Sequence, residues 1–286
     1  MDIQALTAFL RVAETRSFSS AAEDLHLTQP AVSKRVAALE AELGTLLFNR
    51  LGRRVDLTEA GQALLPHARD ITGQLARARQ SIDDLHGAVS GRLRLATSHH
   101  IGLHRLPPVL REYSERFPQV SLDIDFIDSE QAFDALHRGR VELAIVTLPP
   151  QRDDALLSRA IWPDPLVFMA SSEHALAKVD ATPLPLLAKY PGVLPGESTF
   201  TGQIARNVFE SQGLDLNVAL STNYLETIRM MATVGLGWTL LPRSMLQPPL
   251  QVLSVPGVQL SRELGLVHHG TRQLSNAASA FIQLLP

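Results

Sequence analysis

Residues 28 to 35 carry polar side chains whose types suit contact with nucleic acid. A turn at Thr28 and Pro30 is followed by polar side chains near the start of a helical pattern, namely Gln29, Ser33, Lys34 and Arg35. Gln can form two hydrogen bonds with adenine, Arg or Lys can bind guanine, and Ser can bond to a base or a phosphate. The segment therefore indicates contacts with the major groove of double-stranded DNA.

Three arginines lie on the next short segment, namely Arg50, Arg53 and Arg54. Apolar and polar residues alternate there around Gly52, as in a small hairpin. Arginines on such a hairpin suit contacts with phosphates or with a narrow minor groove. Acidic and basic residues nearly balance over residues 1–62, so solvated surface is the alternative interpretation of these charges.

Three predicted helices would position the recognition residues. Apolar residues recur at helical spacing over residues 3–15, and a second short helix follows a cap within residues 17–20. Thr28 is expected to cap the third helix, with Pro30 in its first turn and Gly44 at its end. Two short helices joined by a tight turn match a helix-turn-helix, whose second helix enters the major groove by its N-terminal end.

A long helix is predicted from Thr58 to about Leu85. Its apolar stripe has heptad spacing and consists of Leu64, Ala68, Ile71, Leu75, Ala78, Ile82 and Leu85. A heptad stripe of this kind favours pairing with a second helix, which predicts a homodimer. The alternative is an amphipathic helix that lies on its own domain.

Beyond a linker at residues 86–92, strands alternate with helices, which indicates a parallel sheet. A second β/α unit is expected to begin near Pro165. The predicted fold class is α+β multidomain. It has a winged helix-turn-helix at 1–58, a linker helix and hinge at 59–90, and an α/β domain at 91–286. The last domain is expected to comprise subdomain I (about 91–162 and 268–286) and subdomain II (about 163–267).

Several polar residues follow predicted strands, where α/β sheets bind ligands beside the N-termini of helices. They are Ser98, His99, His100, Ser129, Thr147, Ser198, Thr199 and Phe200. Asn223 and Tyr224 form a weaker candidate. Each Ser or Thr has an alternative role as an ordinary helix cap.

The histidine-rich segment at residues 98–104 raises the question of a metal site. His100 and His104 are four residues apart and would share a helix face, but the sequence shows no third ligand or nearby carboxylate in register. No metal is therefore predicted, and His99 or His100 is expected to line the ligand cleft. His268 and His269 are expected to lie near the second crossing between the subdomains.

Composition narrows the function further. The chain has 286 residues and no cysteine, which excludes thiolate catalysis and disulfides. Neither a signal peptide nor an apolar run of membrane-spanning length is visible, so a cytoplasmic location without membrane contact is expected. The motifs of serine hydrolases and phosphate-binding loops are absent, and we expect neither an enzyme nor a cofactor.

Residues 1–65, which include "FSSAAEDLHLTQPAVSKRVAALEAELG" and "FNRLGRRVDLTEAG", closely resemble the N-terminal domain of LysR-type transcriptional regulators. The remaining layout is similar to that family as well. "GRVELAIV" and "VGLGWTLLP" resemble recurring stretches of its effector domain, which has two subdomains like a periplasmic binding protein.

The resemblance implies a ligand-responsive regulator that binds dyad promoter sites as a dimer of dimers. It implies homodimers through the linker helix, a homotetramer, and a small-molecule effector between the subdomains, with an organic anion and RNA polymerase as candidate partners. Matching recognition positions are Gln29, Ser33 and Lys34, with Arg53 and Arg54 in the wing. Arg35 departs from the uncharged polar residue that other members often carry.

Two other classes of function remain as alternatives. The first is a cytoplasmic solute-binding module whose N-terminal part mainly forms oligomers. The second is an enzyme on a β/α scaffold, which would need a polar catalytic cluster that the sequence does not show.

Overall fold

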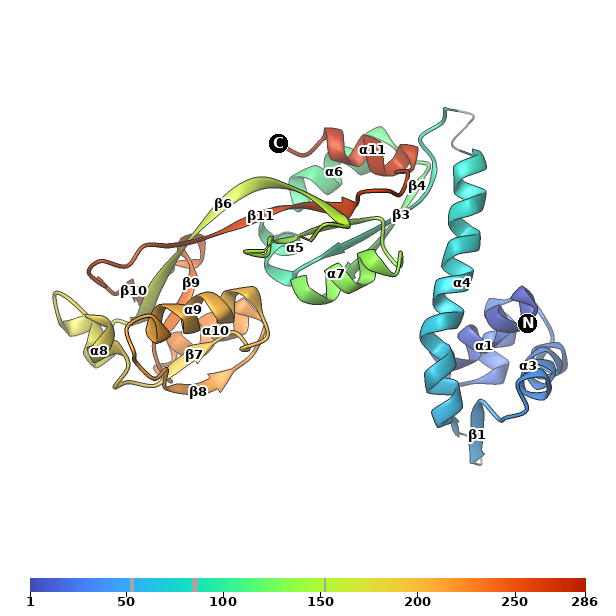
Figure 1. Cartoon of the computed structure of the whole chain (residues 1–286), viewed down its shortest axis with the longest axis horizontal. Coiled ribbons are helices and arrows are strands. Elements are labelled where there is room, and N and C mark those ends of the chain that lie inside the picture. The colour runs from blue at the N-terminus through green and yellow to red at the C-terminus, as the bar shows by residue number, and fades with distance from the viewer. Residues whose placement is uncertain (52–53, 84–86, 152) are drawn as a thin grey trace. The chain divides into compact units, whose positions relative to one another are not determined.

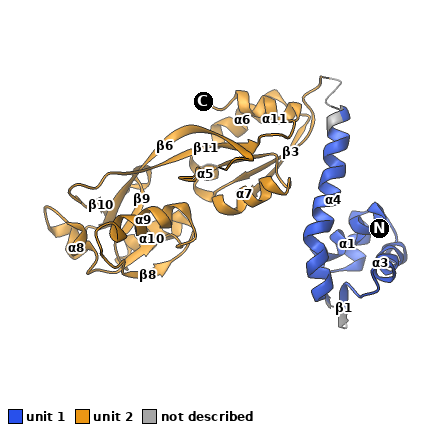
Figure 2. Ribbon diagram, viewed as in Figure 1, with its two compact units in different colours: residues 1–86 blue, residues 87–286 orange. Residues whose placement is uncertain are grey.

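The structure is a computed structural model that describes residues 1–51, 54–83, 87–151 and 153–286. The chain forms two units, residues 1–86 and residues 87–286 (Figure 2). Within the described residues, no helix is both long and apolar enough to span a bilayer.

The first unit begins with three helices, α1 (Ile3–Thr15), α2 (Phe18–Asp24) and α3 (Gln29–Leu43) (Figure 1). Ser17 caps α2 by accepting a hydrogen bond from the backbone N–H of Ser20 at 3.2 Å. Thr28 caps α3 in the same way, and Gly44 ends α3 at a φ of 67°, where a residue without a Cβ is favoured. The predicted helices, turn and caps are therefore confirmed.

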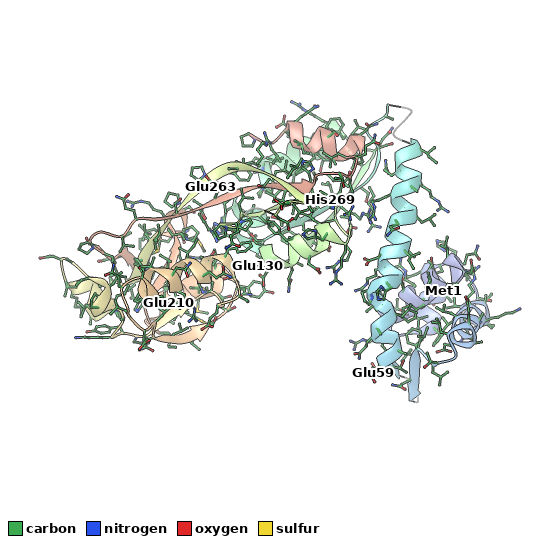
Figure 3. All side chains as sticks on the ribbon, viewed as in Figure 1. Met1, Glu59, Glu130, Glu210, Glu263 and His269 are labelled. Carbon is green, nitrogen blue, oxygen red and sulfur yellow. The ribbon has the colours of Figure 1, made fainter. Side chains whose placement is uncertain are left out.

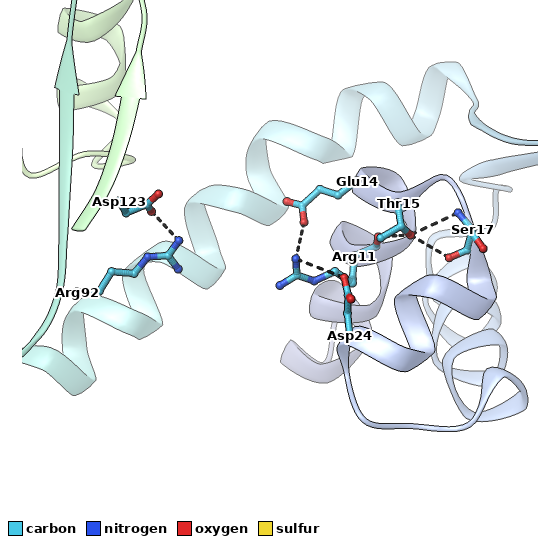
Figure 4. Close-up of polar contacts among 7 residues, drawn as sticks. All are labelled: Arg11, Glu14, Thr15, Ser17, Asp24, Arg92 and Asp123. Carbon is cyan, nitrogen blue, oxygen red and sulfur yellow. Dashed lines mark hydrogen bonds and ion pairs between the residues drawn. The ribbon is translucent and has the colours of Figure 1, made fainter. Parts of the chain in front are cut away.

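Polar contacts link α1 to its neighbours (Figure 4). Arg11 contacts Glu14 at 3.1 Å and Asp24 of α2 at 3.9 Å. The hydroxyl of Thr15 donates to the carbonyl of Ser17 at 2.9 Å, which holds the turn between α1 and α2. These contacts are solvent-exposed or nearly so, and the apolar core beneath them supplies most of the stabilisation.

The predicted hairpin is present as β1 (Phe48–Leu51) and β2 (Arg54–Leu57), which pair antiparallel. A buried carboxylate joins this hairpin to α3. Glu40, only 7% exposed, accepts hydrogen bonds from the backbone N–H groups of Leu47 at 2.8 Å and Phe48 at 3.3 Å. These bonds fix the start of the hairpin against the helix that carries the predicted recognition residues.

The long helix α4 spans Glu59–Asp83, so Leu85, which the sequence placed at its end, lies outside the described residues. Its first half is packed on the core of the unit, where Ala68 is fully buried and Leu64 is half-buried. Further along the stripe, Ile71 is 37% exposed and Ile82 is 62% exposed. The apolar stripe is thus only partly covered by its own chain.

The second unit has two subdomains joined by a seven-stranded sheet in the order β10-β6-β11-β5-β3-β4, with β9 paired to β6. In subdomain I, β3 pairs in parallel with β4 and β5, and α7 and α11 belong to apolar clusters that include strand residues. Arg92 of β3 also contacts Asp123 of β4 at 2.6 Å (Figure 4). The elements of this part are β3 (Gly91–Thr97), α5 (His99–His104), α6 (Pro107–Arg116), β4 (Val120–Phe126), α7 (Ser129–His137), β5 (Leu143–Thr147) and α11 (Asn276–Gln283).

Subdomain II contains a second small parallel sheet, β7 with β8, and an apolar core around the fully buried Trp238. Two long strands, β6 (Leu156–Ser171) and β11 (Leu260–His269), run antiparallel through both subdomains (Figure 1). The remaining elements are η2 (Ala175–Lys178), α8 (Leu184–Leu187), β7 (Gly192–Leu194), α9 (Phe200–Glu210), β8 (Val218–Ser221), α10 (Leu225–Thr233), β9 (Thr239–Pro242), η3 (Arg243–Met245) and β10 (Leu250–Val252).

These two strands make the sheet a mixed one, whereas the sequence indicated a parallel sheet. Strand β11 lies antiparallel between β5 and β6, and it pairs with β5 from Leu264 to His268. The chain has therefore rejoined the sheet of subdomain I before residue 268, where the sequence placed the return. His268 and His269 end β11 within that sheet, beside Leu156 and Leu157 of β6, and not at the crossing between subdomains.

Candidate nucleic-acid interface and ligand cleft

The N-terminal end of α3 presents the predicted recognition residues. Gln29 and Lys34 are exposed, and Ser33 and Arg35 are half-buried. The amide of Gln29 donates a hydrogen bond to the hydroxyl of Ser33 at 2.9 Å, so the two side chains form one polar pair. Val32 and Val36, both fully buried, fix the opposite face of the helix.

The hairpin holds two of the three predicted arginines within its described backbone. Arg50 pairs with Val55 across the strands, and Arg54 begins β2 opposite Leu51. Arg53 lies outside the described residues. Their role in DNA contact stays a prediction.

A cleft in the second unit brings together seven of the eight residues that the sequence predicted for the effector, and only Ser198, which is exposed, lies outside it. The cleft encloses a cavity of about 50 Å³ between the two subdomains. A cavity needs about 10–15 Å³ for one water molecule, so this one holds a few waters. The lining consists of Ser98, His99, His100, Asp128, Ser129, Glu130, Thr147, Pro195, Thr199, Phe200, Thr201, Asn223, Leu225 and Arg262.

The predicted hydroxyl groups differ in the hydrogen bonds that they make. Ser98 precedes α5 and makes no capping hydrogen bond with its side chain. Ser129 accepts from the backbone N–H of Thr147 at 3.1 Å, which ties α7 to β5. Thr199 donates to the carbonyl of Gly196 at 2.7 Å and accepts from the N–H of Gly202 at 3.0 Å. Thr199 therefore has the ordinary capping role that the sequence left open.

Two carboxylates of subdomain I reach across the cleft. Glu130 accepts a hydrogen bond at 2.6 Å from the backbone N–H of Phe200, the first residue of α9 (Figure 3 labels Glu130). Asp128 accepts a hydrogen bond from the side-chain amide of Asn223 at 2.6 Å, and Asn223 in turn accepts from the N–H of Gly196 at 3.1 Å. The first contact places a carboxylate at the positive end of a helix dipole.

A buried ion pair lies where β6 and β11 cross between the subdomains. Arg262, 7% exposed, donates to Asp164, 1% exposed, at 2.8 Å, and to the hydroxyl of Thr201 at 2.6 Å. The sequence reasoning missed Arg262, Asp164 and Thr201. The only signal in the sequence was a charged residue, Arg262, within an apolar strand pattern. Its partner Asp164 lies 98 residues away, so the sequence could not reveal the pair.

The cleft shifts the pKa values of His100 and Glu130. Burial, and next the positive charge of Arg262, lower the pKa of His100 to about 4, so its ring is neutral at neutral pH. Burial raises the pKa of Glu130, and Asp128 raises it further, against hydrogen bonds from the N–H groups of Glu130 and Phe200. Glu130 therefore takes up a proton at a higher pH than an ordinary glutamate does.

The histidine-rich segment has a carboxylate neighbour that the sequence did not reveal. Glu226, in the first turn of α10, lies 3.0 Å from Nε2 of His104 and 3.6 Å from Nδ1 of His100. The expectation of no nearby carboxylate was wrong, because His104 and Glu226 are 122 residues apart in the chain. The rings of His99 and Tyr224 are also in contact, with centroids 4.8 Å apart.

A helix-turn-helix with a hairpin, a long helix and a two-subdomain α/β unit with a ligand cleft together define a class of protein, the ligand-responsive DNA-binding regulators. Comparison with known proteins supports this class. Residues 3–62 match the family described as bacterial regulatory helix-turn-helix protein, lysR family, and residues 86–286 match the LysR substrate binding domain.

Individual relatives agree with this assignment. The chain is 32% identical to the HTH-type transcriptional activator CmpR of Synechocystis sp., over 97% of this chain and 92% of that protein. It is 66% identical to an uncharacterized HTH-type transcriptional regulator of Azotobacter vinelandii, over 38% of this chain and 75% of that protein. The fold resembles full-length CbnR in complex with its target DNA, with a TM-score of 0.72, 22% identity, and coverage of 100% of this chain and 99% of that one.

The chain belongs to the LysR family, and it is a ligand-responsive DNA-binding transcriptional regulator.

Proposed function

We propose that this regulator binds a small organic anion in the cleft between subdomains I and II, and that this binding changes its affinity for promoter DNA. The observation that carries the proposal is the carboxylate of Glu130 on the backbone N–H of Phe200, 2.6 Å away. In this contact the N-terminus of α9 binds a carboxylate of the same chain. An effector carboxylate would take the same position and displace Glu130.

The charges of the cleft support an effector that competes with Glu130. The guanidinium of Arg262 is already paired with Asp164 at 2.8 Å, so it offers little unbalanced positive charge. Attraction for an anion comes instead from the N-termini of α7 and α9, which line the cavity with Ser129 and Phe200. The hydroxyl of Ser98, which makes no capping hydrogen bond to α5, would supply a further hydrogen bond.

The size of the cleft implies that binding is coupled to motion of the subdomains. A cavity of about 50 Å³ is too small for an organic acid, so the subdomains must separate or rearrange around the ligand. Because β6 and β11 are the strands that cross between them, bending of these strands is the expected motion. The effector shifts the equilibrium only to the extent that it binds one arrangement better than the other.

The proposal for DNA places α3 in the major groove through Gln29, Ser33 and Lys34, with the hairpin arginines on the phosphates. Two copies would pair through α4, since Ile71 and Ile82 of its stripe are left exposed by their own chain. Two such dimers would then read an interrupted dyad site. A full switch from 1:99 to 99:1 needs about 5.5 kcal/mol, which four effector sites can share.

The experiment is a titration of labelled promoter DNA with the full chain, in the presence and absence of a panel of small carboxylic acids. An acid that binds in the cleft should change the DNA affinity or the length of the protected site. The same acid should lose its effect when Ser98 is replaced by Val, which removes the hydroxyl and keeps the β-branched size. If an acid still acts fully on Ser98→Val and on a Phe200→Pro variant, which lacks the N–H, the effector lies elsewhere.

A further inference from the structure

Three side chains with metal-binding atoms meet where α5 of subdomain I faces α10 of subdomain II. His100 and His104 lie one turn apart on α5, and Glu226 lies in the first turn of α10. One donor atom from each residue lies within 4.8 Å of the others. The two histidine rings are also in contact, with centroids 4.9 Å apart.

The two distances from Glu226 fit tetrahedral coordination. Metal–ligand bonds of about 2.0–2.1 Å at tetrahedral angles place neighbouring donor atoms about 3.3 Å apart. Oε1 of Glu226 lies 3.0 Å from Nε2 of His104 and 3.6 Å from Nδ1 of His100, on either side of that value. Small side-chain shifts would bring all three atoms onto one ion.

His100 supplies an independent observation that points to a ligand. Its side chain is 4% exposed, and neither ring nitrogen has a hydrogen-bond partner among the described residues. A buried polar group without a partner is destabilising, so such groups are rare in folded proteins. A metal ion at Nδ1 would give that nitrogen a partner.

The donor set consists of two imidazoles, from His100 and His104, and the carboxylate of Glu226.

We propose that His100, His104 and Glu226 bind a divalent first-row transition metal of the Zn²⁺ type, with water as the fourth ligand. Two imidazoles and one carboxylate suit this class better than Ca²⁺ or Mg²⁺, which prefer oxygen ligands. The ion can enter from solvent, because the side chains of His104 and Glu226 are 49% and 30% exposed.

The position of the site gives the metal a structural consequence. Its ligands come from both subdomains, and His100 also lines the cavity of the cleft. A bound ion would therefore hold α5 and α10 together and oppose separation of the subdomains. Metal binding at this site is independent of the proposed effector, and its test needs neither DNA nor an organic acid.

The test is a calorimetric titration of the chelator-treated full chain with Zn²⁺ alone. One equivalent should bind to the wild-type chain. Loss of a ligand in His104→Ala or Glu226→Gln should weaken binding by about a hundredfold, since even outer-shell changes cost roughly tenfold to a hundredfold. Glu226→His, which replaces one ligand by another, should restore binding. Both altered side chains are partly exposed, and circular dichroism would verify the fold.

His137→Ala is the matched control, because His137 is exposed and lies 2.7 Å from the carboxylate of Asp153 outside the proposed site. Its Zn²⁺ affinity should equal that of the wild-type chain. Equal affinity in Glu226→Gln and the wild type, or the same loss in His137→Ala, would overturn the proposal. The cobalt-loaded chain should show the visible bands of tetrahedral Co²⁺, and six-coordinate bands would contradict the proposed geometry.

Hydrogen exchange tests the link between subdomains. Zn²⁺ should slow exchange in α5 and in the backbone around Glu226 of the wild-type chain, and in neither segment of Glu226→Gln. Protection confined to α5 would show that the ion does not bridge the two helices.

Discussion

The carboxylate of Glu130 accepts a hydrogen bond from the backbone N–H of Phe200 at 2.6 Å, and this bond joins two subdomains from positions 70 residues apart. If an effector carboxylate binds at this helix N-terminus, as we propose, it must compete with Glu130.

Replacing Glu130 by Gln should strengthen the binding of an organic anion. The amide oxygen of Gln can still accept from Phe200, but the negative charge that repels the ligand is gone. We expect a gain of roughly tenfold in affinity, the size of one lost charge-assisted contact of about 1.4 kcal/mol. Calorimetry with the active acid would measure it, and an unchanged or weaker affinity would contradict competition at α9.

Anion binding by the wild-type chain should strengthen as the pH falls towards the raised pKa of Glu130. Burial, with Asp128, raises that pKa above the ordinary 4.5, while Arg262 opposes the shift. The protonated form is uncharged, so repulsion of the ligand disappears as the carboxyl takes up its proton. Affinity measured at several pH values should show this rise, and Glu130→Gln should flatten it. An equal rise in both proteins would assign the pH dependence to another group.

Replacing Lys34 by Ala should weaken promoter binding and reduce the slope of log K against log salt by about one unit, as the loss of one phosphate contact requires. Lys34 is exposed on α3, and Lys178, exposed in η2, provides the control as Lys178→Ala. Anisotropy titrations at several salt concentrations would measure both. Identical slopes for the two variants would place Lys34 away from the phosphates.

Replacing Glu40 by Ala should destabilise the first unit. The change leaves the buried N–H groups of Leu47 and Phe48 without their acceptor, which costs about 1–3 kcal/mol. Glu42 is the control, because its contact with the N-terminal amine is exposed and worth little. Urea unfolding of the isolated variants should separate them, and equal stabilities would show that Glu40 does not anchor the hairpin.

Replacing Ala78 by Asp should dissociate the α4 dimer, whereas Ala76→Asp should not. Both alanines are exposed on the same helix, but only Ala78 lies on the heptad stripe. The substitutions have equal effects on helix propensity, so a difference between them reports the interface. Sedimentation velocity would follow the dimer, and equal dissociation by the two variants would exclude pairing through this stripe.

The N-terminal helices could be predicted from the sequence because short-range chemistry determines them. Thr28, Pro30 and Gly44 act within one turn of the helix they bound, and the apolar spacing of α3 requires no distant partner. For the same reason, the sequence located Ser98 and Thr199 at the helix N-termini that line the cleft.

Only the tertiary structure decided which distant residues meet. The pairing of β6 with β11 brings Asp164 to Arg262, and closure of the cleft brings Glu130 to Phe200 and Glu226 to His104. No local pattern encodes these contacts, because each depends on where two separate chain segments dock. The sequence by itself determined the LysR-type layout and the polar strand ends, whereas long-range packing decided which charged side chains and histidines meet between the subdomains.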